Sequence, residues 1–238
     1  PKAADVLRDC LYRGADRAVL LTDRRAAASD TLATSYILSK AVEAVGKYDF
    51  VFCGRQAIDG DTAQVGPQIA EKLGVPQITY LEELISLSDR TVRIRRTLGN
   101  GWEVVEAELP VLVTVVETAN EPRPPRARRV MRFKRARVEA EVAGEVVQAL
   151  PDASDEGKKE AEVARRTGEL KGAGLLIEQW DLDDIGADLA RCGRNGSPTK
   201  VHRVQSIVLT KEGYTEVQPT EEGVRELIHE LVMDRTLG

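Results

Sequence analysis

The chain has 238 residues, of which 42% are hydrophobic and 31% charged, and its formal net charge is −5. This length suits one large α/β domain or a domain with a long extension, and the apolar share excludes a wholly disordered chain. No apolar run approaches the roughly 18 residues of a membrane helix, so we expect no membrane insertion. The aromatic share of 4% and the negative charge argue against a nucleic-acid partner.

Cysteine and histidine are sparse. The three cysteines, Cys10, Cys53 and Cys192, lie far apart in sequence, which predicts a reducing, cytoplasmic location without a disulfide framework. The two histidines, His202 and His229, have no neighbours at metal-ligand spacing and no companion acid or nucleophile. The sequence therefore predicts neither a metal site nor a catalytic residue.

Residues 1–80 alternate between helix and strand patterns. The helices are expected at 3–13, 30–45 and 65–73, and the strands at 18–21, 49–53 and 76–79. Alternation at this spacing predicts a parallel sheet with crossover helices.

Residues 84–116 change to a period of two. Residues 84–87, 91–96 and 102–109 alternate, and Asn100-Gly101 is a turn signal between the last two segments. This predicts an antiparallel ribbon, followed by a buried strand at 112–116.

The composition shifts after Asn120. Residues 122–137 contain eight Arg and Lys and no acid, whereas residues 139–169 contain nine Asp and Glu and four Arg and Lys. We expect further elements beyond this shift. They are a linker at 151–155, a charged helix ending near Arg166, a short helix at 182–189, a turn at 195–198, a strand at 204–209 and a helix at 220–233.

The loop from Cys53 to Pro67 follows a buried strand and opens a helix. Ligands of open α/β sheets bind outside the carboxyl ends of the strands, where a helix start offers unpaired N–H groups to a phosphate. Asp59 and Asp61 would repel a phosphate unless they face away, cap the helix or hold ribose hydroxyls. The residues alone leave a nucleotide loop and a simple capped loop equally open. Neither the P-loop nor the Rossmann glycine spacing is present.

A second helix start, Ser29 to Thr34, offers the same chemistry. Its hydroxyl and carboxylate groups are also ordinary N-caps, and simple capping is the reading that its local sequence favours.

Together these segments resemble the β subunits of electron transfer flavoproteins. The likeness is carried by Gly54–Pro67, Gly74–Tyr80, Leu109–Thr114, Asn120–Arg123 and Val130-Met131, in the order and spacing of that family over about residues 1–140. The resemblance implies an open parallel-sheet, nucleotide-binding α/β domain of the adenine-nucleotide α-hydrolase-like type, with an antiparallel ribbon and a C-terminal arm. It divides the chain into this domain at 1–138 and a linker and arm at 139–238 that wraps an α subunit.

The resemblance also implies a cofactor in the β subunit, which is AMP in the ordinary branch and FAD in the electron-bifurcating branch. The segment Cys192–Val201 is similar to the anaerobe and Fix-like branch, so FAD is favoured over AMP, with NADH as a possible electron donor. The residues expected to bind the cofactor are Asp30, Thr31, Thr34, Cys53, Gly54, Gln56, Asp61, Thr62, Ala63, Gln64 and Val65.

The partners implied are the α subunit together with an acyl-CoA or other dehydrogenase, a quinone reductase or ferredoxin. The family docks such partners on a recognition loop, which corresponds to residues 121–131 of this chain. The residues expected there are Glu121, Pro122, Arg123, Arg126, Ala127, Arg128 and Met131. The usual apolar anchor is replaced by arginines, which predicts electrostatic docking. Pairing of these arginines with the downstream acidic stretch or with the α subunit is equally compatible with the sequence.

The chain also differs from the family at its start. About sixty or seventy residues with a first strand and further nucleotide contacts have no counterpart, so an N-terminal truncation is expected. Two alternatives from other classes share the same loop: an adenine-nucleotide-binding regulatory protein without a redox role, and a structural subunit with a permanently bound ligand. The apolar stripe of the last helix fits docking on a partner or packing on its own domain.

Overall fold

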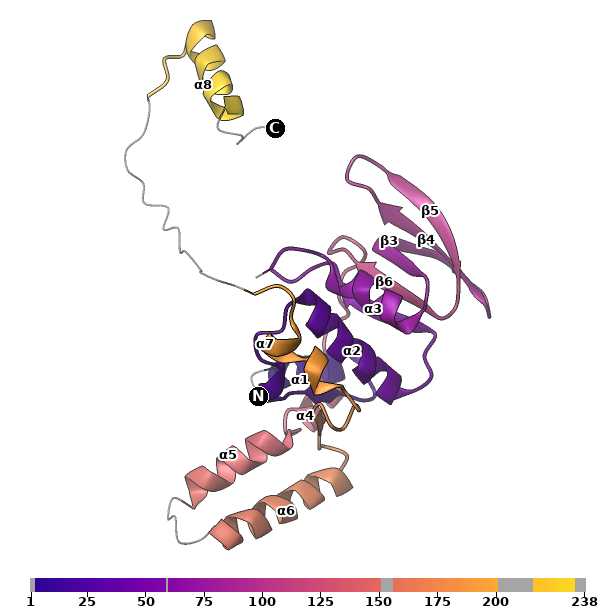
Figure 1. Cartoon of the computed structure of the whole chain (residues 1–238), viewed down its shortest axis with the longest axis vertical. Coiled ribbons are helices and arrows are strands. Elements are labelled where there is room, and N and C mark those ends of the chain that lie inside the picture. Colours follow the sequence, from indigo (N-terminus) through magenta and orange to yellow (C-terminus); the bar gives the residue numbers. More distant parts are fainter. Residues whose placement is uncertain (1–2, 59, 151–155, 201–215, 234–238) are drawn as a thin grey trace. The chain divides into compact units, whose positions relative to one another are not determined.

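The structure is a computed structural model and describes residues 3–58, 60–150, 156–200 and 216–233. It divides into two compact units, Pro1–Lys200 and Val201–Gly238. The first unit contains helices α1 (Ala4–Arg13), α2 (Thr31–Val45), α3 (Val65–Leu73), α4 (Ala127–Phe133), α5 (Glu139–Ala149), α6 (Glu156–Gly172) and α7 (Gly193–Gly196). Its strands are β1 (Val19–Leu21), β2 (Phe50–Gly54), β3 (Gln77–Leu87), β4 (Thr91–Thr97), β5 (Trp102–Glu108), β6 (Val111–Val115) and β7 (Glu178–Trp180) (Figure 1).

The larger sheet has five strands in the order β2-β6-β3-β4-β5. Strand β6 pairs in parallel with β2 and β3, whereas β4 pairs antiparallel with β3 and β5. The predicted crossover sheet and ribbon are therefore confirmed. The sequence suggested separate strands at 76–79 and 84–87, but the structure joins them in β3, which bends through two irregularities in its pairing with β4.

The strand predicted at 18–21 exists but does not join the five-stranded sheet. It is β1, and it pairs in parallel with β7 in a sheet of two strands. Sequence patterning could not show this, because β7 is only three residues long and lies more than 150 residues further along the chain. β1 therefore belongs to a second, small layer, which the C-terminal third of the chain completes.

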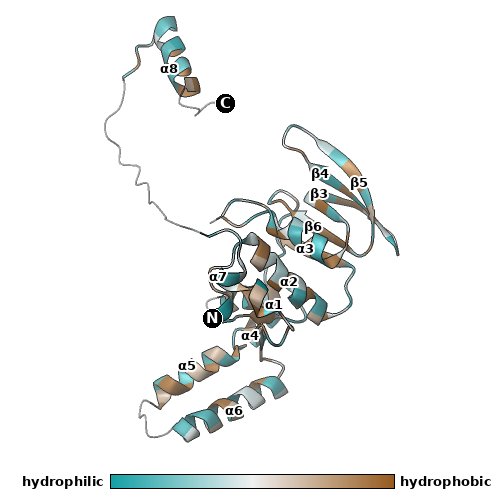
Figure 2. Cartoon of the chain, viewed as in Figure 1, coloured by the Kyte–Doolittle hydropathy of each residue, from teal (hydrophilic) through white to brown (hydrophobic). Residues whose placement is uncertain are grey.

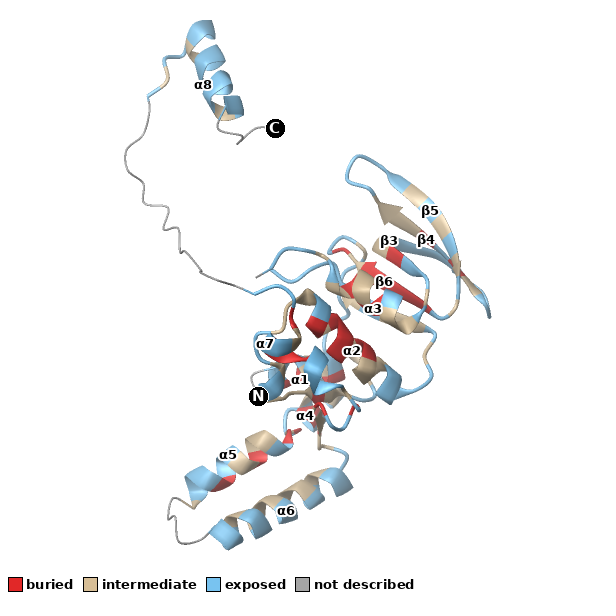
Figure 3. Ribbon diagram, viewed as in Figure 1, coloured by how far each residue is buried: buried red, intermediate tan, exposed pale blue. Residues whose placement is uncertain are grey.

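Strand β6 is almost wholly buried, and helix α2 buries one side, which carries Tyr36 and Ile37 (Figure 3). Val111, Leu112 and Val113 have no exposed surface, and Leu112 packs beneath α3. A Cβ atom at Gly66 would lie 2.7 Å from Cγ2 of Thr114, so only glycine lets α3 approach β6 this closely.

Helices α5 and α6 pack side by side (Figure 1). The sequence predicts α6 but not α5, whose Val142 and Val146 are buried. No residue of α6 is buried, and Figure 2 shows it as the more hydrophilic of the two. Arg8 of α1 ties this hairpin to the domain through two bonds of 2.9 Å to the Glu141 carboxylate.

Residues 181–187 form successive turns instead of the short helix predicted at 182–189. Asp181 accepts hydrogen bonds from the backbone N–H groups of Asp183 and Asp184, and these bonds compete with a helix. A 3₁₀ turn at Leu189–Arg191 leads directly into α7.

The second unit contains α8 (Glu221–Met233), as predicted. The Thr220 hydroxyl accepts a hydrogen bond of 3.1 Å from Gly223 N and so caps the helix. The strand predicted at 204–209, the linker at 151–155 and His202 lie outside the described residues.

We expect Gly66→Ala to lower the free energy of unfolding by about 1–3 kcal/mol, because the added methyl group forces Thr114 or α3 to shift. Gly144→Ala is the matched control, since a Cβ atom there meets nothing within 4 Å and alanine favours the α5 helix. Thermal or urea unfolding of both variants measures the difference. Equal stabilities would show that α3 does not depend on this close approach.

Candidate functional site

The carboxyl ends of β2 and β6 lie at one edge of the sheet, beside the point where the parallel pairing of β3 with β6 stops. In the strand register, Gly54 of β2 lies beside Val115 of β6, which lies beside Leu81 of β3. The β2–α3 loop and the start of α3 lie at this edge. This is the position at which open α/β sheets bind their ligands.

The β2–α3 loop has an unusual backbone. Asp61 and Ala63 adopt φ values of 50° and 53°, in the left-handed region that residues other than glycine seldom occupy. The Gln56 side-chain amide donates a hydrogen bond to the Asp61 carboxylate. Asp61 is therefore engaged within the loop, but a bond from a neutral amide leaves the negative charge of its carboxylate in place. Asp59 lies outside the described residues.

Helix α3 begins without a side-chain cap, since the side chain of its N-cap residue, Gln64, makes no capping hydrogen bond. The first N–H groups of a helix have no partner inside the helix, and Pro67 has no N–H group. The N–H groups of Val65 and Gly66, together with the positive end of the helix dipole, therefore suit an anion.

Helix α2 begins beside α3. The Thr31 hydroxyl donates a hydrogen bond of 3.1 Å to Oε1 of Gln64, which joins the two helix starts. Asp30 caps α2, because its carboxylate accepts a 2.9 Å hydrogen bond from Ala33 N. Burial acts to raise the pKa of Asp30, but the hydrogen bonds from Ala33 N and Thr199 N outweigh it and hold the pKa below its ordinary value.

Thr34 lies one turn into α2 and lines a cavity of about 170 Å³ together with Asp23, Ser29 and Leu182. This volume is below the roughly 300 Å³ of the smallest ordinary ligand pockets, so a nucleotide would need the open surface at the strand ends as well.

The predicted site residues thus fall into two adjoining groups. Asp30, Thr31 and Thr34 belong to α2, and Cys53, Gly54, Gln56, Asp61, Thr62, Ala63, Gln64 and Val65 run from the end of β2 to the first residue of α3. The Thr31–Gln64 bond brings the two groups together. Cys53 is half-buried, and its burial raises the pKa of the thiol.

Sequence reasoning missed two residues of this edge. The Arg55 guanidinium carbon lies 5.7 Å from the ring centroid of Tyr80, so the loop is held across the ends of the strands by a cation–π contact. Tyr80 has a φ of 61° and its N–H group binds the Thr114 hydroxyl at 3.0 Å. Ile58, in the same loop, is 98% exposed.

The expected docking segment is partly helical. Glu121, Pro122, Arg123 and Arg126 lie in irregular chain, Ala127 begins α4, and Met131 on α4 is 61% exposed. The Arg129 side chain donates to the backbone carbonyls of Leu11 and Ala15 at the end of α1.

The arginines near this segment differ in their partners. Arg137 pairs with Glu145 at 2.9 Å, as pairing with the acidic stretch would require. Within the described ranges, Arg126 and Arg128 have no acidic partner and are exposed. Their charges are available to a partner molecule.

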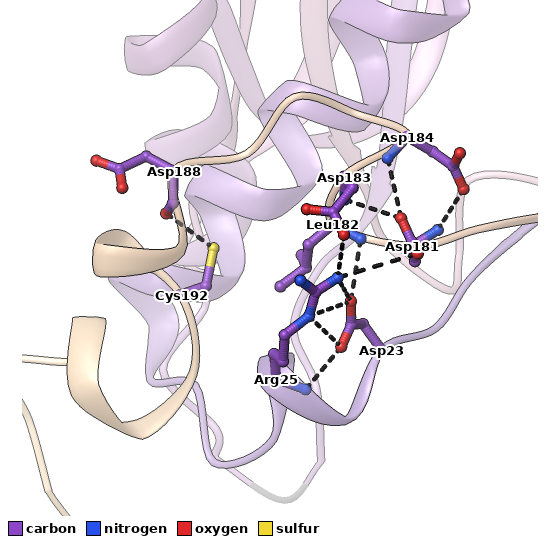
Figure 4. A network of polar contacts seen from close by, with 8 residues as sticks. All are labelled: Asp23, Arg25, Asp181, Leu182, Asp183, Asp184, Asp188 and Cys192. Carbon is purple, nitrogen blue, oxygen red and sulfur yellow. Dashed lines mark hydrogen bonds and ion pairs between the residues drawn. The ribbon is translucent and has the colours of Figure 1, made fainter.

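A separate polar network joins the loop after β1 to the loop after β7. The Arg25 guanidinium forms ion pairs with the Asp23 carboxylate at 2.6 Å and with the Asp183 carboxylate at 2.8 Å (Figure 4). Side-chain bonds from Arg25 hold the pKa of Asp23 well below its usual range. The Asp23 carboxylate also accepts a 3.2 Å bond from Leu182 N. The network therefore fastens the segment 181–184 to the chain before α2.

Neither a metal cluster nor a membrane helix is found where the structure is described. Within residues 3–58, 60–150, 156–200 and 216–233, no group of three or more His, Cys, Asp and Glu residues is placed to hold a metal ion. Among these same residues, no helix combines the length and apolar character needed to cross a membrane.

Comparison with known proteins agrees with this arrangement. The electron transfer flavoprotein domain matches residues 1–146. The electron transfer flavoprotein subunit beta of Clostridium acetobutylicum is 36% identical over 231 residues, which cover 97% of this chain and 73% of the relative. The chain belongs to the electron transfer flavoprotein β-subunit family.

Two further relatives have other names. The caffeyl-CoA reductase-Etf complex subunit CarD of Acetobacterium woodii is 38% identical over 203 residues, covering 85% of this chain and 62% of CarD. The protein FixA of Azorhizobium caulinodans is 39% identical over 211 residues, covering 86% of this chain and 61% of FixA. The chain thus spans between about three fifths and three quarters of the length of these relatives.

We expect Asp23→Asn to reduce stability near neutral pH, because it removes the charge that holds Arg25. The folded-state pKa of Asp23 is depressed, so its stabilising effect is present above the unfolded pKa of about 4 and is lost as pH falls through the folded value. The difference in melting temperature between wild type and D23N should shrink below about pH 4. A constant difference from pH 7 to pH 3 would contradict this role of Asp23.

Proposed function

We propose that this chain binds a nucleotide cofactor, FAD, at the carboxyl edge of β2, β6 and β3, and that it transfers electrons in a heterodimer with an electron transfer flavoprotein α subunit. The observation that carries the proposal is the meeting of two helix starts at that edge, joined by the bond from Thr31 to Gln64. Membership of the family supplies the redox context.

The residues present fit a nucleotide for two reasons. The start of α3 has no side-chain cap, so its N–H groups are available for phosphate oxygens. The left-handed backbone at Asp61 and Ala63 turns the loop at the point where α3 begins, and such strain persists where the surroundings or a ligand stabilise it.

Bound FAD would supply the electron-accepting ring, while the protein supplies binding, orientation and electrostatics. In this proposal the N–H groups of Val65 and Gly66 bind the phosphates, Thr31 and Thr62 offer hydroxyl groups, and Gln56 keeps the Asp61 carboxylate occupied. The half-buried Cys53 and the exposed Gly54 bring the β2 backbone to the same edge. No acid–base or nucleophilic residue is required.

FAD is preferred over AMP because the segment Cys192–Val201 resembles the anaerobe and Fix-like branch, and FixA is among the relatives. In that branch NADH would donate two electrons, which are divided between a high-potential and a low-potential acceptor. A dehydrogenase, a quinone reductase or ferredoxin would serve as partner, and the cytoplasm as location.

The basic docking segment at residues 121–131 is proposed to receive an acidic surface of the partner. Arg126 and Arg128 are exposed, and the exposed side chain of Met131, three residues after Arg128, adds an apolar contact. Such charges mainly accelerate association and select the partner, and they contribute less to affinity.

The arm at 139–238 is proposed to bind the α subunit through α8. Val224, Ile228 and Val232 share one side of this helix, and each is about half exposed. An unpartnered apolar stripe of this kind suits a helix that docks on another protein.

The nucleotide content of the heterodimer tests the proposal. The full chain is co-purified with its α subunit, and the released nucleotides are identified and counted. Two FAD per heterodimer are expected. One FAD and one AMP would overturn the FAD assignment and the bifurcating role, and a complex without flavin would overturn the redox function.

The position of the cofactor is tested by Thr62→Trp, which places a bulky side chain in the loop three residues before α3 begins. Because Thr62 is exposed, we expect the variant to fold and to lose one nucleotide per heterodimer. Ala161→Trp, on the exposed surface of α6, is the matched control and should keep both nucleotides. Equal retention by both variants would place the cofactor elsewhere.

Docking is tested by Arg128→Glu with Lys47→Glu as a control of equal charge change. We expect Arg128→Glu to slow electron transfer to the partner several-fold at low ionic strength, and the difference to vanish in high salt because charges are screened. Stopped-flow measurement against salt concentration reports both effects. Identical salt dependence in the two variants would contradict docking at this segment.

A further inference from the structure

The segment Cys192–Thr199 packs against the chain that leads into α2. Gly193 N donates a 3.1 Å hydrogen bond to the Ser29 hydroxyl, and Asp30 N donates a 2.8 Å hydrogen bond to Oγ of Ser197. Thr199 N donates at 2.9 Å to the Asp30 carboxylate. Three contacts therefore act on two successive residues at the start of α2.

This packing is tight. Ser197 is 3% exposed, and its hydroxyl donates a 2.7 Å hydrogen bond to Gly193 O. Gly193 has a φ of 61°, and a Cβ atom there would lie 2.1 Å from the Arg25 carbonyl oxygen. Ala28, just before the contacts, has a φ of 59°. The segment thus holds the loop before α2 in a conformation that its own sequence does not favour.

Further along, the same stretch of chain contacts the body of α2. Asp188 N donates a 2.9 Å hydrogen bond to the hydroxyl of buried Tyr36, and the Arg191 guanidinium carbon lies 3.9 Å from the centroid of the Tyr36 ring. The Cys192 thiol is buried and donates to Asp188 O at 3.3 Å (Figure 4). Helix α2 is therefore held at its start and at its second turn by residues 188–199.

Residues 188–199 lie outside the part of the chain that matches the electron transfer flavoprotein domain, which ends at residue 146, whereas Ser29, Asp30 and Tyr36 lie inside it. We infer that Ser197 is a positioning residue of the nucleotide site: through Asp30 it sets the orientation of the α2 N-terminus, and it thereby tunes nucleotide affinity. The inference rests on the proposed function.

The physical argument is one of pre-organisation. Asp30 uses one carboxylate oxygen to cap α2 and the other to accept from Thr199 N, while its own N–H group is bound by Ser197. Without Ser197, the loop at Ala28 is free to leave its left-handed conformation. Thr31, whose hydroxyl reaches Gln64, would then lose its fixed position relative to α3. A ligand that binds both helix starts would then have to fix the start of α2 relative to α3. The free energy spent on this ordering would lower the affinity for the ligand.

The test compares Ser197→Ala with Ser39→Ala in the full heterodimer. Ser39 is also buried and its hydroxyl bonds a backbone carbonyl, that of Tyr36, but it has no contact with Asp30. The nucleotide dissociation constant should rise about fivefold to tenfold in S197A, the loss expected for one hydrogen bond, and stay near the wild-type value in S39A. Melting temperatures should fall by similar amounts in both variants.

Hydrogen exchange provides a readout that does not depend on the ligand. Amides of residues 30–34 should exchange faster in S197A than in S39A, each compared with wild type. Equal nucleotide affinity in S197A and wild type, or unchanged exchange at 30–34, would overturn the inference. A wild-type heterodimer that holds no nucleotide would instead overturn the proposed function.

Discussion

Parallel pairing of β6 with both β2 and β3 is the constraint on which the rest of the site depends. Because the three strands run in one direction, the ends of β2 and β6 at Gly54 and Val115 lie beside Leu81, where the parallel pairing of β3 stops. The loop that follows β2 must then start its helix at that edge. Gly66 lets α3 approach β6 closely, which fixes the height and direction of the helix start. The anion site proposed at this edge is thus a consequence of sheet direction and one missing side chain.

The second helix start reaches this edge by a different route. The strand before α2 is β1, which lies outside the five-stranded sheet and pairs with β7. Helix α2 is consequently positioned by α3 on one side and by residues 181–199 on the other. The ion pairs of Arg25 and the hydrogen bonds to Asp30 are the contacts on the second side. Because β1 does not join the larger sheet, residues 181–199, which lie outside the matched domain, support the start of α2, which lies inside it.

The arginines of the basic stretch differ in whether the fold already provides them with a partner. Two arginines of the basic stretch bind within the fold: Arg129 binds the end of α1, and Arg137 binds Glu145. Arg126 and Arg128 remain exposed, next to Met131. The net charge of −5 therefore conceals a basic surface whose size is smaller than the sequence count suggests. Its neighbour, the α5–α6 hairpin, carries the compensating acids in internal pairs, among them Arg166 with Glu162 at 2.7 Å.

Local signals in the sequence determined much of the fold and the outline of the site. The helices at 31–45 and 65–73 have clear ends at Asp30, Gly46 and Gly74, and the ribbon shows a two-residue alternation. Residues that share a loop, such as Gln56 and Asp61, could be grouped from sequence because a short loop keeps them together. The family, too, could be identified from the spacing of these segments.

Only the tertiary structure decided which distant segments meet. The pairing of β1 with β7, the cation–π contact of Arg55 with Tyr80 and the bonds from Ser197 and Thr199 to Asp30 join residues that are far apart in the chain. Such contacts leave no periodic pattern, because each depends on a single pair of groups whose approach is set by packing elsewhere. The turns at 181–187 show the same limit: their apolar and acidic residues suggest a helix, but hydrogen bonds to Asp181 and the network around Asp23 favour turns. The sequence alone therefore located the two helix starts, and the packing of residues 181–199 decided how one of them is held.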